Sequence, residues 1–265
     1  MHRFNGLVIG VALLCVFWAM PAHATIDWED SFEYANATAL YSAWSASCPP
    51  TSANPNVSTD RAYSGSKSVK LTYNGAVGVD PGAGGCFIDR YLNALSDTLY
   101  MRVYMWIDPA FQVNSTGTKM INIAHDGHRP NFWWEMLFGQ TTLSVVVSSL
   151  TPPAFNVYGG AIPRGQWACL EGQFTMNTPG VPNGIIRTWV NGAAHINRTD
   201  LLLRNATTID DSGPASRIGF VRLYVQHGVG LLYYDDFAVS RDAKIGCTGS
   251  PAGDIQAPRV PLNLR

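Results

Sequence analysis

The sequence predicts an all-β protein, built as a sandwich of antiparallel strands. Segments in which apolar and polar residues alternate recur every dozen or so residues, and clusters of Gly, Pro and Asn separate them. No stretch has the sustained 3.6-residue period of an amphipathic helix. The low content of charged residues, 14% of the chain, and the 25 Gly and 16 Pro residues favour strands and turns. Because all-β sandwiches often reach this length, we expect one large domain.

Residues 1–24 have the features of a secretory signal peptide. A short basic opening with Arg3 precedes the apolar run 6–20, and Ala22 and Ala24 supply the small residues that signal peptidase requires. The apolar run is shorter than the roughly 20 residues that cross a bilayer as a helix. We therefore expect cleavage after Ala24, a secreted or periplasmic protein, and no membrane insertion of the mature chain.

The charge balance argues against some classes of partner. The chain has 18 basic and 19 acidic residues, and removal of Arg3 with the leader leaves 17 basic residues and a formal charge of −2. Such a balance does not predict binding to nucleic acid or to an anionic membrane. We expect a monomer.

Four cysteines remain once Cys15 has left with the leader. An even set of cysteines in an exported protein predicts disulfides. Four cysteines allow three pairings, and the sequence alone does not choose between them. We favour Cys48 with Cys86 and Cys169 with Cys247, because each bond then stays within one half of the chain. A metal site is the weaker alternative, since no two cysteines have CxxC spacing.

Two distant segments each have one apolar face and one unusual polar face. In residues 99–107 every second residue is apolar and is expected to enter the core. The opposite face of this segment carries Tyr100, Arg102, Tyr104 and Trp106. In residues 218–227, the polar face carries Arg222, Tyr224 and Gln226. Aromatic rings interleaved with charges are typical neither of a dry interior nor of an ordinary surface.

Two further segments extend the polar pattern. Residues 185–190 offer Arg187 and Trp189 on one face, and residues 169–176 offer Glu171 and Gln173. We interpret all four segments as strands that share one sheet face and form a groove. The polar residues of 99–107 and 218–227 should then cluster in space. The alternative is that they are scattered surface residues, each ordinary by itself.

Turn residues separate several of the strands. The segments 177–180 (Asn-Thr-Pro-Gly) and 182–184 (Pro-Asn-Gly), and the pair Asn191-Gly192, predict tight turns of the kind that join hairpins. Residues 249–265 are rich in Pro and poor in large apolar residues, so we interpret them as a tail that follows the domain 25–248.

Several segments together resemble the concanavalin A-like jelly rolls. The resemblance rests on residues 85–92, 99–104, 167–171, 177–180, 189–192 and 233–239, and it covers nearly all of 25–247. Within that superfamily the match is closest to polysaccharide-lyase-like proteins related to heparin and glucuronan lyases. The resemblance implies a two-sheet antiparallel jelly roll whose concave sheet binds an extended, anionic polysaccharide.

The resemblance also limits the expected chemistry. The Glu-x-Asp-x-x-Glu strand of laminarinase-type members is absent, so glycoside hydrolysis by paired carboxylates is not expected. The arginine-rich strand and the Gln-Val/Ile-His strand of common alginate lyases are also missing. A looser lyase set remains compatible: a His or Tyr that abstracts a proton, and an Arg, Gln or Asn that neutralises a uronate carboxylate. Such β-elimination needs a base and an acid but no cofactor.

Four residues are candidates for this catalysis: His125, His128, Tyr224 and Arg102. The two histidines belong to residues 125–129, a loop that could overhang the concave face; the alternative is a polar loop that hydrogen-bonds itself. Arg102, Arg222 or Arg187 could bind a carboxylate with both guanidinium arms, although an arginine or tyrosine on a strand is most often structural. We interpret His195, which follows a turn, as structural.

The remaining candidates would bind the substrate or a metal. The expected substrate-binding residues are Tyr100, Tyr104, Trp106, Arg129, Trp134, Glu171, Gln173, Arg187, Trp189, Arg222 and Gln226. By resemblance, Glu33 and Asp236 are candidate ligands of a structural Ca²⁺, a cation that prefers oxygen ligands. The alternative is that Asp235 simply caps the edge of its strand.

Two functions from different classes fit these observations. The first is a secreted polysaccharide lyase that cleaves a uronate-containing glycan by β-elimination. The second is a non-catalytic carbohydrate-binding or surface-adhesion domain on the same fold, because a fold does not fix a function. Only the histidines of the 125–129 loop favour the lyase.

Overall fold

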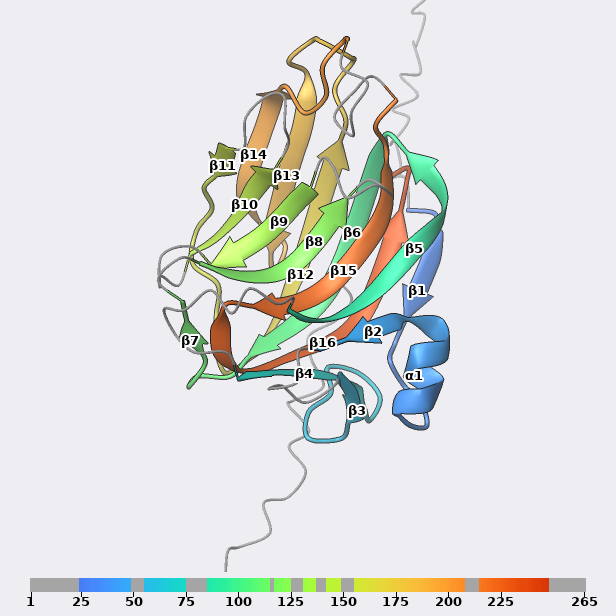
Figure 1. The fold of residues 1–265 in the computed structure, drawn as a ribbon, viewed down its shortest axis with the longest axis vertical. Helices are drawn as coiled ribbons and strands as arrows, with labels where there is room; N and C mark the ends of the chain where they lie inside the picture. Colours follow the sequence, from blue (N-terminus) through green and yellow to red (C-terminus); the bar gives the residue numbers. More distant parts are fainter. Residues whose placement is uncertain are drawn as a thin grey trace, which may run out of the picture.

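The computed structural model describes residues 24–48, 55–74, 85–114, 117–124, 131–136, 142–148, 155–207 and 215–247. These residues form two stacked sheets, and every strand pair among them is antiparallel (Figure 1). The nine-stranded sheet has the order β14-β13-β12-β6-β16-β4-β3, with β1 and β7 also paired to β16. The seven-stranded sheet, which faces the viewer in Figure 1, has the order β11-β10-β9-β8-β15-β5-β2.

The strands of the nine-stranded sheet are β1 (Trp28–Asp30), β3 (Asn56–Ser58), β4 (Ser68–Asn74), β6 (Thr98–Ile107), β7 (Gln112–Val113), β12 (Trp167–Thr175), β13 (Gly184–Val190), β14 (Ala193–Leu201) and β16 (Gly228–Ser240). The strands of the seven-stranded sheet are β2 (Ser45–Ser47), β5 (Cys86–Ser96), β8 (Thr118–Ala124), β9 (Asn131–Met136), β10 (Leu143–Ser148), β11 (Phe155–Val157) and β15 (Ile218–Gln226). Helix α1 (Ala37–Ala43) begins after Asn36, whose side chain accepts a hydrogen bond from the Ala39 N–H.

This architecture confirms the predicted all-β, two-sheet jelly roll. Neither sheet closes into a barrel, and no helix among the described residues is long and apolar enough to cross a bilayer. The predicted signal peptide (1–24) and tail (249–265) lie almost entirely outside the described residues, so these boundaries stay predictions.

One apolar core fills the space between the sheets. From β6 the core receives Leu99, Met101, Val103, Met105 and Ile107, and from β15 it receives Val221, Leu223 and Val225. These are the faces that the two-residue period assigns to the interior, so that part of the prediction is confirmed. Each buried side chain of this size contributes about 1.5–3 kcal/mol relative to an exposed one, so the core fixes which face of each strand turns outward.

The turn between β13 and β14 shows why its residues are Asn and Gly. Asn191 and Gly192 have φ angles of 51° and 79°, in the left-handed region that a two-residue hairpin turn requires. Asn and Gly adopt this region more readily than other residues. The predicted hairpin is therefore confirmed.

Both predicted disulfides are present. Cys48, which follows β2, is bonded to Cys86 at the start of β5, and these two strands are neighbours in the seven-stranded sheet. Cys169 of β12 is bonded to Cys247, which follows β16. The second bond fixes the chain after β16 to the outer face of the nine-stranded sheet.

Replacing Cys169 and Cys247 together by Ser should lower the free energy of unfolding by about 2–5 kcal/mol. This bond spans 78 residues and the Cys48–Cys86 bond spans 38. The longer loop restricts the unfolded chain more, by about 0.6 kcal/mol for a doubling in length, so its loss should be the more costly. Urea unfolding of the two double-Ser variants measures this difference, and disulfide peptide mapping that finds bonds between the halves would contradict the pairing.

Candidate functional site

The outer faces of the two sheets lie on opposite sides of the molecule. Strand β6 belongs to the nine-stranded sheet and β15 to the seven-stranded sheet, and both send their apolar residues into the shared core. Their outward residues therefore point away from each other. The prediction that Tyr100, Arg102 and Tyr104 cluster with Arg222, Tyr224 and Gln226 is wrong. Alternation assigns the core face of a strand, but it does not say which sheet the strand joins.

Part of the outer face of the nine-stranded sheet is covered by residues 61–64. The Asp235 carboxylate holds this segment by accepting hydrogen bonds from the main-chain N–H groups of Tyr63 (2.7 Å) and Ser64 (3.3 Å). The Tyr63 ring stacks on Tyr104 with 3.5 Å between centroids. The neighbouring Trp106 is 1% exposed and Tyr104 is 2% exposed. These two predicted sugar-contacting rings are therefore buried beneath a segment of the protein itself.

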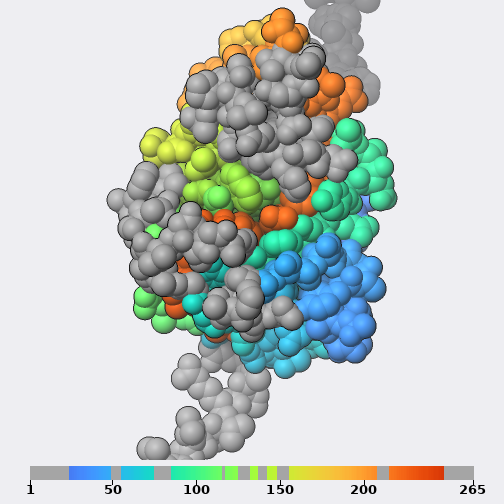
Figure 2. Space-filling model, viewed as in Figure 1, coloured from blue at the N-terminus to red at the C-terminus, as the bar shows by residue number. Residues whose placement is uncertain are grey.

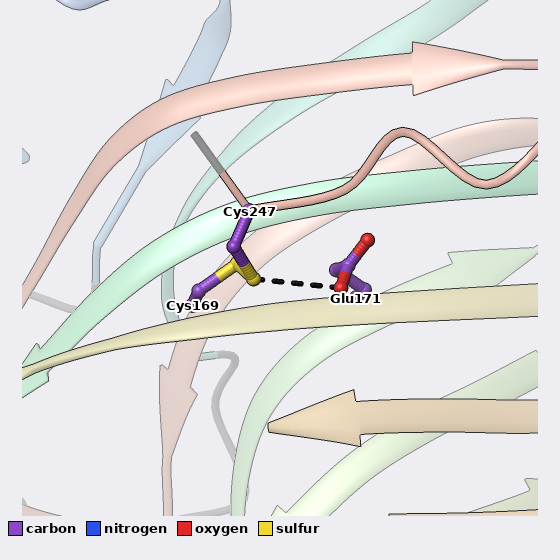
Figure 3. A group of neighbouring side chains, drawn as sticks. All are labelled: Cys169, Glu171 and Cys247. Atoms are coloured by element: carbon purple, nitrogen blue, oxygen red, sulfur yellow. Dashed lines mark hydrogen bonds between the residues drawn. A yellow bond between two sulfur atoms is a disulfide. The ribbon is translucent and has the colours of Figure 1, made fainter. Parts of the chain in front are cut away.

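Residues 241–247 cover a second part of the same face, beside the Cys169–Cys247 disulfide (Figure 3). Glu171 accepts a hydrogen bond from the Gly246 N–H (2.8 Å) and forms a 3.0 Å ion pair with Lys244. Arg102, its neighbour in register, donates to the carbonyl groups of Asp236 (3.4 Å) and Gly246 (3.3 Å). In this structure, Arg102 and Glu171 fasten the chain after β16 to the sheet.

This network contains the one group of three potential metal ligands found among the described residues. Cys169, Glu171 and Cys247 have ligand atoms within 4.8 Å of one another. Figure 3 shows the three side chains side by side. Both sulfur atoms belong to the disulfide, however, and cannot act as thiolate ligands. The group therefore holds the chain after β16 to the sheet and is not a metal centre.

Four other predicted substrate-binding residues share this sheet face, as the alternation indicated. Arg187 donates to Gln173 (3.3 Å), and the Lys244 ammonium lies 4.6 Å from the Trp189 ring centroid. Tyr100 lies opposite Gln173 in register. Gln173 is buried and the other three predicted residues are half-buried, so they form a polar surface beside the segment 241–247.

The outer face of the seven-stranded sheet is turned toward the viewer in Figures 1 and 2. The green and orange atoms of β8, β9 and β15 cross the middle of Figure 2. Strand register places Asp89, Arg222, Asn122 and Trp133 in one row, and Lys119, Glu135 and Ser144 in another. Four of these polar residues are at most 7% exposed: Asp89, Asn122, Glu135 and Ser144. Polar side chains are rarely buried unless they have a structural or functional role, so this face is the candidate functional site.

Trp133, and not Trp134, is the indole on this outer face. Trp134 is 2% exposed and packs in the core, with its ring 5.9 Å from that of Phe174. Trp133 has its ring 5.5 Å from that of Tyr224, and the Lys119 ammonium lies 4.5 Å from its centroid. The assignment of Trp134 to the substrate is therefore corrected: its indole faces the interior, and Trp133 holds a cation and a phenol side by side.

Arg222 is engaged by a carboxylate of the protein. Its Nε and Nη2 atoms donate to the two oxygens of Asp89 at 2.6 and 2.8 Å. The guanidinium also lies 3.8 Å from the Phe87 ring centroid. This bidentate ion pair occupies the guanidinium N–H groups that would otherwise bind the carboxylate of a uronate. Arg222 thus ties β15 to β5 and does not present a free guanidinium.

Tyr224 is a buried phenol at the centre of the face. Its hydroxyl oxygen accepts a hydrogen bond from the Gly85 N–H (3.0 Å), and a Cβ atom at position 85 would lie 2.2 Å from the ring. Only glycine allows this approach. Burial raises the pKa of Tyr224 to about 12, so the hydroxyl is protonated at neutral pH, as that of an ordinary tyrosine is, and it is a weaker acid than a tyrosine in water.

Glu135 is a buried carboxyl two residues beyond Trp133. Burial raises its pKa to about 7, although the positive charge of Lys119, opposite it in register, acts in the other direction. A carboxyl group that titrates near neutral pH can hold or release a proton under physiological conditions. Gln226 is half-buried at the end of β15, opposite Lys119.

The remaining predicted site residues are placed only in part. His125, His128 and Arg129 lie outside the described residues, in the segment that follows the last residue of β8, Ala124. His195 hydrogen-bonds Thr188 and the main chain of Gly160, in agreement with a structural role.

Several residues of the face were not anticipated from the sequence. Glu135 could have been found, because Phe132, Trp134 and Met136 are apolar and leave Glu135 on the opposite face with Trp133. Asn122 could have been found in the same way, because it lies between the core residues Ile121 and Ile123, but Lys119 could not. A register shift between Lys119 and Ile121 breaks the alternation of β8.

Comparisons with known proteins identify the fold. No family model and no curated protein matches the sequence. An endo-β-1,4-glucuronan lyase from Trichoderma reesei has a similar structure, with a TM-score of 0.61 and 11% identity over 82% of this chain and 96% of that one. A cellulose-induced protein, Cip1, matches with a TM-score of 0.58 and 17% identity, over 83% of this chain and 99% of that one.

A PL-14 alginate lyase from Aplysia kurodai also matches, with a TM-score of 0.58 and 12% identity over 82% of this chain and 100% of that one. At these identities the likeness shows the fold alone. The chain therefore shares the jelly-roll fold of these proteins, the fold that the sequence resemblance implied.

Replacing Asp89 by Ala should destabilise the protein by about 3–5 kcal/mol, because it leaves the Arg222 charge buried without its partner. The side chains of Arg222 and Asp89 are only 16% and 7% exposed. Asp200, which pairs with Arg198 on the surface, provides the matched control, and Asp200→Ala should leave the urea midpoint unchanged. Equal small losses in the two variants would show that the Asp89–Arg222 pair does not support the sheet.

Proposed function

We propose that the protein binds an anionic, uronate-containing polysaccharide on the outer face of the seven-stranded sheet and cleaves it by β-elimination. The observation that carries the proposal is the cluster of Lys119, Glu135 and Tyr224 around Trp133, which brings a cation, a buried carboxyl and a protonated phenol together. The structural likeness to a glucuronan lyase and an alginate lyase supports uronate polymers as the substrate class.

Substrate binding on this face would depend on Lys119 and Gln226. Both are half-buried and lie opposite each other in register, so both can reach a ligand on the sheet. The Lys119 ammonium is not held in a close ion pair by any described carboxylate, whereas Arg222 is bound to Asp89. Lys119 therefore takes the role of balancing negative charge that the sequence suggested for Arg222.

The elimination itself would use Tyr224 as its acid. The reaction removes the proton at C5 of a uronate and expels the O4 oxygen, which must receive a proton as it leaves. The Tyr224 hydroxyl is protonated at neutral pH and so carries the proton that this step requires. We assign the base to His125 or His128, in the segment directly after β8, and a contact with the substrate to Arg129 in the same segment.

The second candidate is a non-catalytic carbohydrate-binding or surface-adhesion domain that uses the same face. The observation in its favour is the Asp89–Arg222 pair, which occupies an arginine that a lyase could use. In either case we propose a monomer that acts outside the cytoplasm, after loss of residues 1–24. The two disulfides are compatible with an oxidising compartment.

We also propose that Glu33 and Asp236 hold a structural Ca²⁺. Both line a cavity of about 600 Å³, together with Glu29 and Asp30, and carboxylate oxygens suit this cation. Burial raises the pKa of Asp236, and the nearby carboxylates of Glu29 and Glu33 raise it further, a repulsion that a cation would relieve. The main-chain N–H groups of Ser66 and Lys67 donate hydrogen bonds to the Glu33 carboxylate, so the ion would share this carboxylate with them.

The lyase is tested by incubating the mature protein with a panel of uronate polysaccharides and following the ultraviolet absorbance of the unsaturated uronate product. Tyr224→Phe should remove most turnover while glycan affinity stays nearly unchanged, because the hydroxyl acts in proton transfer. His125→Ala should likewise remove most turnover and leave glycan affinity nearly unchanged. Tyr100→Phe, the same change on the opposite sheet, is the control and should leave turnover intact.

The binding-domain alternative makes the opposite prediction. No glycan of the panel would give an unsaturated product, and Trp133→Ala would abolish affinity, because it removes the ring that supports Lys119. Loss of turnover in Tyr100→Phe but not in Tyr224→Phe would place the active site on the nine-stranded sheet and would contradict the proposal.

The Ca²⁺ proposal is tested by thermal unfolding with and without a chelator. A chelator should lower the melting temperature of the wild-type protein by mass action, and Asp236→Asn should abolish this response. Asp200→Asn, on the surface of β14, should keep the full response. An unchanged wild-type melting curve in chelator would remove the ion from the account.

A further inference from the structure

The Glu135 carboxyl group lies on the proposed binding face, next to Lys119 and Ser144 in strand register. Its side chain projects from β9 on the outer face of the sheet, and the residue is only 7% exposed. In the part of the chain that the structure describes, no residue forms a hydrogen bond or a close ion pair with its oxygens. Ser144, its neighbour in register on β10, instead accepts a hydrogen bond from Gly159. No described residue therefore occupies the Glu135 oxygens, and a group on the outer side of the sheet can bind them.

The charged groups described around Glu135 can balance one additional negative charge. From β8 it faces Lys119, whose ammonium also lies over the Trp133 ring, and from β10 it faces the uncharged Ser144. From β15, the Tyr224 ring contacts Trp133. The Arg222–Asp89 pair lies in the neighbouring row, which contains Trp133, and is neutral as a unit. His125, His128 and Arg129 follow β8 and lie outside the described residues.

A carboxylic acid can bind a carboxylate directly. Two carboxyl groups at hydrogen-bonding distance do not both ionise, and they share one proton instead. The shared hydrogen bond is charge-assisted and therefore shorter and stronger than a neutral one. Burial already raises the pKa of Glu135 to about 7, and the approach of a second carboxylate would raise it further. The proton needed for such a pair is therefore available on Glu135 at neutral and acidic pH.

We propose that protonated Glu135 donates a hydrogen bond to the carboxylate of a uronate sugar, whose negative charge Lys119 balances, and that this pair selects uronates over neutral sugars. The inference rests on the proposed function and adds the residue that recognises the substrate. Glu135 keeps its proton in the complex, so no bond to carbon forms or breaks in this step. Once Glu135 ionises at higher pH, its charge repels the uronate and binding weakens.

The test compares wild-type protein with Glu135→Gln at about pH 5.5 and about pH 8.5, a range that brackets the Glu135 pKa. The ligands are polyglucuronate and the same polymer with its carboxyl groups reduced to alcohols, and calorimetry measures the affinities. Wild-type affinity for polyglucuronate should fall at least about tenfold between the two pH values, since the protonated fraction falls tenfold per pH unit above the pKa. Glu135→Gln should lose this dependence, because its amide donates at both pH values. Asp200→Asn should keep it.

Protein stability gives a second readout that needs no ligand. Because the folded protein binds the Glu135 proton more tightly than the unfolded chain does, wild-type stability should fall as pH rises from the unfolded value through about 7. Glu135→Gln lacks this loss. The difference between the urea midpoints of the two proteins should therefore shift in favour of the variant as the pH rises to about 7, and it should stay constant at higher pH.

Each outcome is decisive. If polyglucuronate binds and Glu135→Gln keeps the wild-type pH dependence, Glu135 is not the donor, although the proposed function survives. Equal wild-type affinity for the reduced polymer would overturn the selection of uronates. If the wild-type protein binds polyglucuronate at neither pH, the proposed function itself fails. If Glu135→Gln fails to fold, Lys119→Met provides a second variant. This variant should weaken uronate binding at both pH values, and an unchanged affinity would contradict the proposed role of Lys119 beside Glu135.

Discussion

Each central strand must give one of its two faces to the single core between the sheets, and the rest of the structure depends on this constraint. Because side chains alternate along a strand, burial of Val103 in β6 turns Arg102 outward, and burial of Leu223 in β15 turns Arg222 outward. The two strands lie in different sheets, so these arginines end on opposite sides of the molecule. One core thus creates two separate polar surfaces, which can serve different purposes.

The two surfaces differ in how their buried carboxyl groups are satisfied. On the nine-stranded sheet, Asp235 holds residues 61–64 and Glu171 holds residues 241–247, so the buried carboxylates fasten the protein's own chain. On the seven-stranded sheet, Asp89 is matched by Arg222, but Glu135 has no such partner among the described residues. Groups that are already satisfied stabilise a surface, whereas an unsatisfied buried group can be completed by a ligand. This difference is the reason to place the glycan on the seven-stranded sheet.

Local patterns in the sequence were sufficient for the fold class, the core faces of β6 and β15 and the Asn191-Gly192 hairpin. The even number of cysteines predicted two disulfides, but their pairing was only a preference for bonds within each half of the chain. The site depends on non-local pairing, which alternation does not encode, and so residues of β6 and β15 were assigned to one groove although they lie on different sheets. Trp134 was chosen over Trp133 although its apolar neighbours at alternate positions marked the core face. Lys119 joins the face only because a register shift interrupts β8, and no residue pattern signals that shift.

Amide hydrogen–deuterium exchange with and without a uronate oligosaccharide tests most directly whether the seven-stranded sheet carries the glycan site. Binding there should slow exchange in peptides from β8, β9 and β15, because a ligand stabilises the strands that it contacts. Peptides from β6, β12 and β13 should exchange at unchanged rates. Protection confined to those three strands would contradict the account, since it would place the glycan on the face that residues 61–64 and 241–247 partly cover.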